Sequence, residues 1–158
     1  MADPKARSFR ARAATRPRGG ATIPIPFNPA EIWGHRDRYH VTGTIEEVRF
    51  RTTLVHKNGN WQMELAMKSR SSSGLHDGQV VRVEMWPEGP QLDELAPDIG
   101  QALAARPKAQ SAFEALAQFY RKGWLRWIDG TKRRPEERAR RIAEMVDLLE
   151  SGQKERRS

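Results

Sequence analysis

The chain has 158 residues, no cysteine and a formal net charge of +8. This length suits one ordinary domain, or a small domain with a helical appendage. The lack of cysteine excludes a disulfide scaffold, a thiolate zinc site, an iron–sulfur cluster and a cysteine nucleophile, and it makes a reducing cytoplasm the expected location. No apolar run approaches the roughly 18 residues that a membrane helix needs, and the N-terminus lacks the hydrophobic segment of a secretory signal.

The basic charge is concentrated at the two ends of the chain. Residues 1–20 hold six basic residues and one acidic residue. Residues 21–119 hold ten basic and twelve acidic residues, and residues 120–158 hold twelve basic and seven acidic residues. The first of these segments is rich in Arg and almost free of aliphatic side chains, so burial cannot offset its loss of chain entropy. We therefore expect residues 1–20 to be a disordered basic tail.

Residues 41–85 have the alternating pattern of β-strands. The parity of the apolar side chains switches at Glu46-Glu47, which predicts a tight turn or a bulge there. Asn58-Gly59 is a type I′ hairpin signal, and Asp77-Gly78 marks another turn. The cluster Ser71–Ser73 interrupts the pattern and is interpreted as a loop. Short strands at this spacing favour a barrel or a sandwich.

Helical periodicity begins at Pro97. A helix is expected over residues 107–118, with Phe119 continuing its apolar stripe, and another over residues 120–129. The longest helix should start at Pro135 and stop at Gly152. The predicted fold class is α+β: a small closed antiparallel-rich β-barrel of about six strands, followed by three to four short helices. The predicted segments are a basic tail over 1–20, the barrel over 21–95, the helical region over 96–152 and a disordered tail over 153–158.

Six blocks of sequence resemble the YdeI/OmpD-associated family, in which a small barrel domain of unknown function often precedes a helical region. The blocks are IPFNP (25–29), IWG (32–34), VTGTIEEVRFRTTL (41–54), DGQVVRVEM (77–85), APDIGQALAARPKAQSAFEAL (96–116) and WIDGTKRRPEERARRI (127–142). The family has been linked to bacteriocin protection and to outer-membrane porin expression. The resemblance implies this fold and context for the chain, and no catalytic activity is established for the family.

The resemblance also extends to a basic motif at the start of the last helix. The family has a Lys, an acidic residue and Arg pairs there, and Lys132, Glu136, Arg138 and Arg141 occupy those places. Glu137 departs from the family pattern, which usually has a Thr at this position. This departure weakens any site that would use the Thr hydroxyl group.

The same helix carries our candidate site. On a helical wheel Arg138 falls about 40° from Ile142, inside the apolar stripe. Arg134 and Arg141 share that side and Lys132 precedes them, so these four residues could bind a phosphate-like anion or the carboxylates of a partner. In the alternative interpretation, Arg138 buries its aliphatic stem and pairs with an acidic residue of the barrel or of the preceding helices.

Other chemistries find little support in the sequence. The four histidines, at positions 35, 40, 56 and 76, lack the spacing of metal ligands, so we predict neither a metal nor a cofactor. No nucleophile elbow or phosphate-binding glycine loop is present, and Trp124 and Trp127 are expected in the core. We predict a noncatalytic protein that binds an unknown protein partner or a small anionic ligand. The alternative is nonspecific nucleic-acid binding by the basic tail and the Arg-rich last helix.

Overall fold

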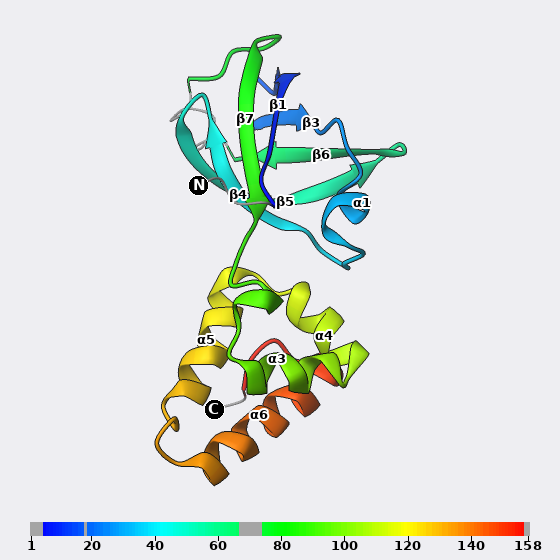
Figure 1. Cartoon of the computed structure of the whole chain (residues 1–158). Helices are drawn as coiled ribbons and strands as arrows, with labels where there is room; N and C mark the ends of the chain where they lie inside the picture. The colour runs from blue at the N-terminus through cyan, green and yellow to red at the C-terminus, as the bar shows by residue number, and fades with distance from the viewer. Residues whose placement is uncertain (1–4, 18, 67–73, 157–158) are drawn as a thin grey trace. The chain divides into compact units, whose positions relative to one another are not determined.

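A computed structural model describes residues 5–17, 19–66 and 74–156, and Figure 1 shows the chain coloured from its N-terminus to its C-terminus. The predicted loop at Ser71–Ser73 lies outside the described residues. The chain divides into two compact units. The barrel unit comprises residues 1–35 and 39–87, and the helical unit comprises residues 36–38 and 88–158.

The barrel unit is a nearly closed antiparallel β-barrel of seven strands, in the order β1-β7-β4-β5-β6-β3-β2. The strands are β1 (Arg7–Arg12), β2 (Ala14–Thr15), β3 (Ala21–Pro24), β4 (His40–Ile45), β5 (Val48–Lys57), β6 (Asn60–Leu65) and β7 (Val80–Pro87). One short helix, α1 (Pro29–Trp33), follows β3. Together with the helices that follow, this barrel confirms the predicted α+β class, with one strand more than expected.

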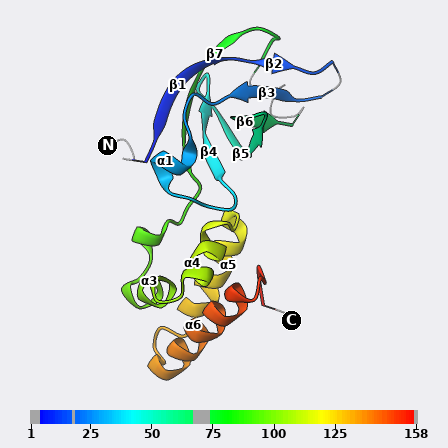
Figure 2. The ribbon, with the colours of Figure 1, turned by 90° about the vertical axis from the view of Figure 1, so that its right-hand side faces the viewer.

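The N-terminal segment completes this barrel. β1 pairs with β7, β2 pairs with β3, and Ala13 between them is only 1% exposed. Figure 2 shows β1 continuing into β2. Within β1, Phe9 and Ala11 pack against the barrel core while Arg10 and Arg12 are exposed. The predicted disorder of residues 1–20 is therefore wrong for these two strands, because alternation alone places enough apolar surface on the inner side of β1.

The predicted turns of the barrel are confirmed. Glu46 and Glu47, between β4 and β5, have φ angles of +48° and +70°. Asn58 and Gly59, between β5 and β6, have φ angles of +52° and +79°. Two consecutive residues with positive φ match the twist of antiparallel strands, so both connections are tight hairpins.

The barrel interior is filled by side chains. The inward-facing residues of the strands form one hydrophobic cluster together with residues of the connecting segments. Its fully buried members with larger side chains are Ile23, Val41, Ile45, Met63, Leu65, Val81, Val83 and Met85. The alternation in the sequence was compatible with either a filled or a hollow barrel, and the structure shows the filled form.

Gly43 permits a close approach between β4 and β7. A Cβ atom on Gly43 would lie 1.9 Å from the carbonyl oxygen of Glu84. A backbone carbonyl in a paired strand cannot move aside, so any side chain at this position would push the two strands apart.

The helical unit contains a short 3₁₀ helix and four α-helices. They are η1 (Leu92–Glu94), α3 (Pro97–Ala104), α4 (Pro107–Glu114), α5 (Gln118–Asp129) and α6 (Pro135–Glu150). Proline stands in the first turn of α3, α4 and α6, where its missing N–H costs no hydrogen bond. The buried faces form a second hydrophobic cluster that includes Leu103, Phe113, Ile128 and Met145.

Two details of the helical unit differ from the sequence prediction. α4 ends at Glu114, before the expected Gln118, because the chain becomes extended at Ala117 and a new helix starts. Phe119 therefore lies on α5, where it is 68% exposed instead of extending the apolar stripe of α4. None of the helices in the described ranges combines the length and apolar composition needed to cross a membrane.

The described residues after α6 contact α5. The indole nitrogen of Trp124 donates a hydrogen bond to the carbonyl oxygen of Lys154 at 2.8 Å. The guanidinium carbon of Arg156 lies 4.1 Å from the centre of the Trp127 ring. The predicted disorder of residues 153–158 is therefore wrong for the described part of this segment, because its return along α5 supplies hydrogen-bond and aromatic partners.

Candidate anion- and partner-binding site

The four predicted site residues lie on the turn between α5 and α6 and on the first two turns of α6. Lys132 and Arg134 are in the turn, and both are exposed. Arg138 and Arg141 follow on α6, where both are half-buried. The structure gives each pair a different set of contacts, and these contacts decide which side chains are available to a ligand.

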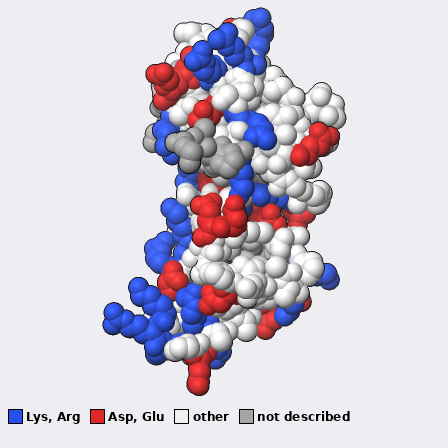
Figure 3. All heavy atoms as spheres, in the orientation of Figure 1, with Lys and Arg blue, Asp and Glu red and all other residues white. Residues whose placement is uncertain are grey.

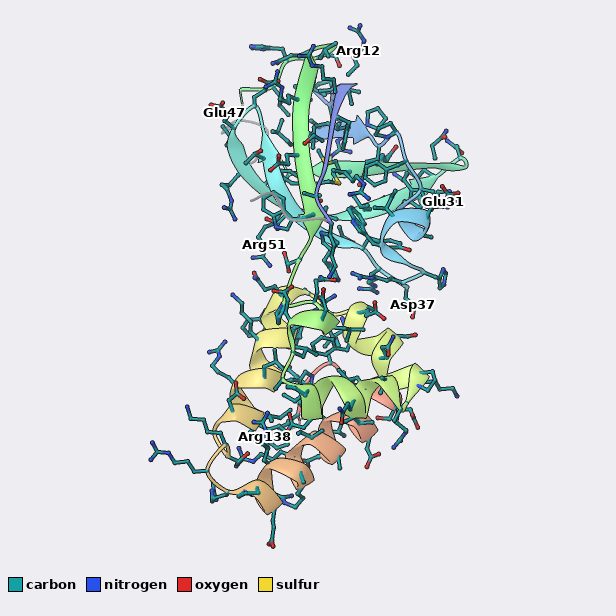
Figure 4. All side chains as sticks on the ribbon, in the orientation of Figure 1. Arg12, Glu31, Asp37, Glu47, Arg51 and Arg138 are labelled. Atoms are coloured by element: carbon teal, nitrogen blue, oxygen red, sulfur yellow. The ribbon has the colours of Figure 1, made fainter. Side chains whose placement is uncertain are left out.

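Arg138 forms ion pairs inside the helical unit. Its guanidinium donates to both carboxylate oxygens of Asp98, at 2.6 and 3.0 Å, and to Asp129 at 3.2 Å. Figure 4 shows its side chain reaching from α6 toward α3. The hydrogen bond from Arg138 to Asp98 lowers the pKa of Asp98, and the same hydrogen bond raises the pKa of Arg138. This arrangement is the alternative interpretation of the sequence, with the acidic partners on the preceding helices.

Arg141 is also engaged within the unit. Its Nη1 donates to the carbonyl oxygen of Trp127 at 2.7 Å, and its Nε lies 3.3 Å from a carboxylate oxygen of Glu137. The guanidinium also lies over the Trp127 ring, 5.0 Å from its centre. These contacts join the first turns of α6 to the last turn of α5, so Arg141 has a structural role at this junction.

Glu137 is shared by two arginines. Arg140 donates to both of its carboxylate oxygens, and Arg141 binds it from the next position along the helix. These hydrogen bonds, that from Arg140 first, lower the pKa of Glu137 to about 2. The residue that departs from the family pattern therefore neutralises part of the basic helix instead of offering a hydroxyl group.

Lys132, Arg133 and Arg134 differ from the arginines that follow them. All three side chains are exposed, and none makes a salt bridge or side-chain hydrogen bond with the residues that the structure describes. We call these three residues the basic turn. In Figure 3 the blue spheres gather at this end of the helical unit. Arg133 was not among the predicted site residues. The sequence shows it between two other cations, and the structure shows that all three are exposed.

One charged group that the sequence analysis missed lies in the core of the helical unit. Arg121, on α5, is 2% exposed. Its guanidinium donates to the carbonyl oxygens of Leu116, Pro90 and Glu114 at 3.0, 2.9 and 2.6 Å. Burial, reinforced by the positive charge of Arg36, lowers the pKa of Arg121 to about 10. Its position on the same face of α5 as Trp124 was the signal that could have revealed it.

Further polar groups surround this arginine. Glu88 is 3% exposed and accepts a hydrogen bond from the backbone N–H of Gln118 at 2.6 Å, at the start of α5. Arg36 donates to the side-chain oxygen of Gln91 at 2.9 Å and lies 3.1 Å from a carboxylate oxygen of Glu114. These hydrogen bonds and ion pairs join groups of the same unit, so we regard the cluster as structural.

The histidines do not meet one another. His40 shares a hydrogen bond with the hydroxyl group of Thr53 at 2.9 Å, and His56 stacks on Trp61 with ring centres 4.7 Å apart. Across the described ranges, no three His, Asp or Glu side chains are grouped as a metal site would require.

A filled barrel followed by a helical unit that carries exposed cations defines a small α+β protein of two units. Residues 94–152 match the family described as "Bacteriocin-protection, YdeI or OmpD-Associated", and residues 9–85 match a domain of unknown function, DUF1905. The helical region therefore carries the YdeI/OmpD-associated domain, and the barrel ahead of it carries the DUF1905 domain, as the resemblance in the sequence implied. A comparison with curated proteins found no match.

Proposed function

We propose that this protein is a noncatalytic binding protein whose basic turn binds an anionic partner. The observation that carries the proposal is the contrast along one short stretch of chain. Arg138, Arg140 and Arg141 are each bound to a carboxylate of the same unit, whereas Lys132, Arg133 and Arg134 have no acidic partner among the described residues. Three adjacent exposed cations attract carboxylates or phosphates.

The placement of the basic turn supports a binding role. Thr131, the residue before it, is fully buried and its hydroxyl donates to the carbonyl oxygen of Ile128 at 2.6 Å. On its other side, Arg138 ties α6 to α3 and α5. The three cations are therefore presented on a short connection between two anchored helices, which lowers the entropy lost when a partner binds. We extend the proposal to the family context: bacteriocin protection or envelope stress would be served through a protein partner.

Matched charge reversals test this proposal. One variant carries Lys132→Glu, Arg133→Glu and Arg134→Glu. The control carries Arg10→Glu, Arg12→Glu and Arg82→Glu on the outer face of β1 and β7, and it changes the net charge by the same amount. The probe is polyglutamate, with binding measured by isothermal titration calorimetry over a salt series. We expect the basic-turn variant to lose binding and the control to keep it. Equal loss in both variants, or no binding by the unmodified chain, would overturn the proposal.

One observation favours nucleic-acid binding as a second candidate. Arg10 on β1 lies directly opposite Arg82 on β7, and both are exposed, as is Arg12. A row of cations on a sheet can follow a phosphate backbone. Deleting residues 1–20 would remove two barrel strands, so the β1/β7 charge reversal is the better test. If double-stranded or single-stranded DNA binds the unmodified chain and this variant loses that binding, the second candidate is favoured.

A further inference from the structure

One side of α5 contributes to a pocket lined mainly by aromatic side chains. Its volume is about 240 Å³, and α5 contributes Phe119, Tyr120, Gly123, Trp124 and Trp127. These residues recur at helical spacing and so share one face of α5. The returning C-terminal segment closes the pocket on another side with Glu155 and Arg156. We call this the α5 pocket.

The stability of the helical unit does not account for the outer part of this pocket. Trp124 is 3% exposed and belongs to the core, but Phe119 is 68% exposed and contacts Tyr120 edge-on, with ring centres 5.2 Å apart. Phe119 is one of two large hydrophobic residues that stand exposed among the described residues, and the other, Val80, lies in the barrel unit. An exposed aromatic side chain beside an open apolar pocket is typical of a protein-binding surface.

Gly123 keeps the α5 pocket open. It lies in the middle of α5, where glycine destabilises a helix relative to other residues. A Cβ atom at this position would meet nothing within 4 Å, and no positive φ angle requires a glycine here. The fold therefore gives no reason for glycine at position 123. A side chain there would, however, occupy the pocket that Gly123 lines.

The lining of the pocket contains one basic and one acidic residue, Arg156 and Glu155, and further cations lie on the same segments. Arg156 stacks over Trp127, and the ammonium group of Lys154 lies 5.9 Å from the centre of the Tyr120 ring. Lys122 and Arg126 are exposed on α5 itself. Three exposed cations outside the lining, Lys122, Arg126 and Lys154, therefore give the surface of α5 and the returning segment an excess of positive charge. An apolar pocket on such a surface is complementary to an apolar side chain flanked by carboxylates, and a second copy of this basic chain would be repelled.

We propose that the α5 pocket receives one aromatic or large aliphatic side chain from an acidic peptide segment of a partner protein. The volume is below the range of small-molecule sites and suits a single anchoring side chain. This inference rests on the proposed function, since it names the kind of anionic partner and adds an apolar anchor. The basic turn attracts negative charge in general, whereas the α5 pocket selects segments that carry the anchor.

The test is a selection with a displayed library of random dodecapeptides on the full chain. We expect enriched peptides to carry an aromatic or large aliphatic residue flanked by Asp and Glu. Synthetic versions should quench the fluorescence of the tryptophans, and Gly123→Leu should weaken their binding by at least about tenfold, because a leucine side chain fills the pocket. The matched control is Gly100→Ala on α3, where the nearest atom to a new Cβ would be 3.9 Å away.

The outcomes are separable from those of the proposed function. Polyglutamate has no apolar anchor, so its binding should depend on the basic turn and be unchanged by Gly123→Leu. The proposal that the α5 pocket receives an anchoring side chain is overturned if no acidic peptide with an apolar anchor is enriched. It is also overturned if the enriched peptides bind Gly123→Leu as well as they bind the unmodified chain. A second measurement replaces the apolar anchor of an enriched peptide by alanine and uses the unmodified chain, so it does not depend on the folding of Gly123→Leu. Unchanged affinity of the alanine peptide would contradict the proposal.

Discussion

The two units of the chain differ in where their charged side chains lie. In the barrel unit the buried residues are apolar, and charged side chains such as Arg10, Arg12 and Arg82 lie on the outer face. The four buried polar residues of the described ranges, Glu88, Gln91, Arg121 and Thr131, all lie in the helical unit. A barrel can sort polar from apolar groups by alternation alone. Short helices joined by irregular turns leave carbonyl groups in the interior, and here a buried arginine satisfies three of them.

The largest expected effect comes from removing this arginine. Arg121→Met should lower the free energy of unfolding by about 4 kcal/mol, because it leaves three buried carbonyl groups without donors and nearby carboxylates without their counter-charge. Urea denaturation measures the loss. The control is Arg126→Met on the exposed side of α5, which should cost less than about 0.5 kcal/mol. Equal effects of the two substitutions would show that the buried arginine is not the organising group of the helical unit.

The barrel provides the counterpart, because its N-terminal strand should depend on apolar packing. Phe9 contacts Phe27 edge-on, with ring centres 5.9 Å apart, and packs against the barrel core. Phe9→Ala should therefore lower the free energy of unfolding by about 2 kcal/mol. Hydrogen exchange of the β7 amides reports it directly. Arg10→Ala, one position along the same strand, should change stability by less than about 0.5 kcal/mol. No effect of Phe9→Ala would mean that β1 is not needed to close the barrel.

The same contrast explains what the sequence could predict. Alternation and turn residues such as Asn58-Gly59 are local signals, and they located the central strands and both tight hairpins of the barrel. β1 was missed because its apolar residues are few and its pairing with β7 joins segments about 70 positions apart. The composition of this segment suggested disorder, but β1 pairs with β7 and β2 pairs with β3, and these pairings hold the segment in the barrel.

The candidate site was predictable only in part. The run of basic residues from Lys132 onward located the region, and the helical wheel showed that Arg138 needed a partner. Its partner Asp98 comes from α3, so only the fold could show which arginines are neutralised. The α5 pocket depends on the exposed side of Phe119, whereas periodicity placed that residue in the α4 stripe. Periodicity identifies apolar faces, but it does not reveal which of them remain uncovered.

Glycine gives a smaller test of the contrast between the units. Gly43 in the barrel has no room for a side chain, whereas Gly123 on α5 has open space around its Cα. Gly123→Ala should raise the free energy of unfolding by about 1 kcal/mol, because alanine loses less backbone entropy in a helix. Thermal denaturation measures the gain, and Gly43→Ala should have the opposite sign. Destabilisation by Gly123→Ala would indicate that this glycine has a structural role and would remove one support for the α5 pocket.

The smallest effect concerns the ion pair between Asp98 and Arg138, which lies at the surface of the helical unit, unlike the buried arginine. The hydrogen bond from Arg138 lowers the pKa of Asp98. Its stabilisation is therefore present above the unfolded-state pKa of about 3.9 and is lost as the pH falls through the lower pKa of the folded state. The Asp98 side chain is 48% exposed, so solvent screening limits the loss in Asp98→Asn to about 0.5 kcal/mol near neutral pH.

The stability difference between the unmodified chain and Asp98→Asn should shrink toward zero in acid, when Asp98 is itself protonated. Urea denaturation as a function of pH measures this difference. The control, Glu144→Gln, changes a carboxylate on α6 that makes no salt bridge with the residues described, so it should change the free energy of unfolding by less than about 0.5 kcal/mol. A pH-independent difference for Asp98→Asn would mean that the ion pair does not stabilise the unit. Arg138 would then be available to an anionic ligand together with the basic turn, as the sequence first suggested.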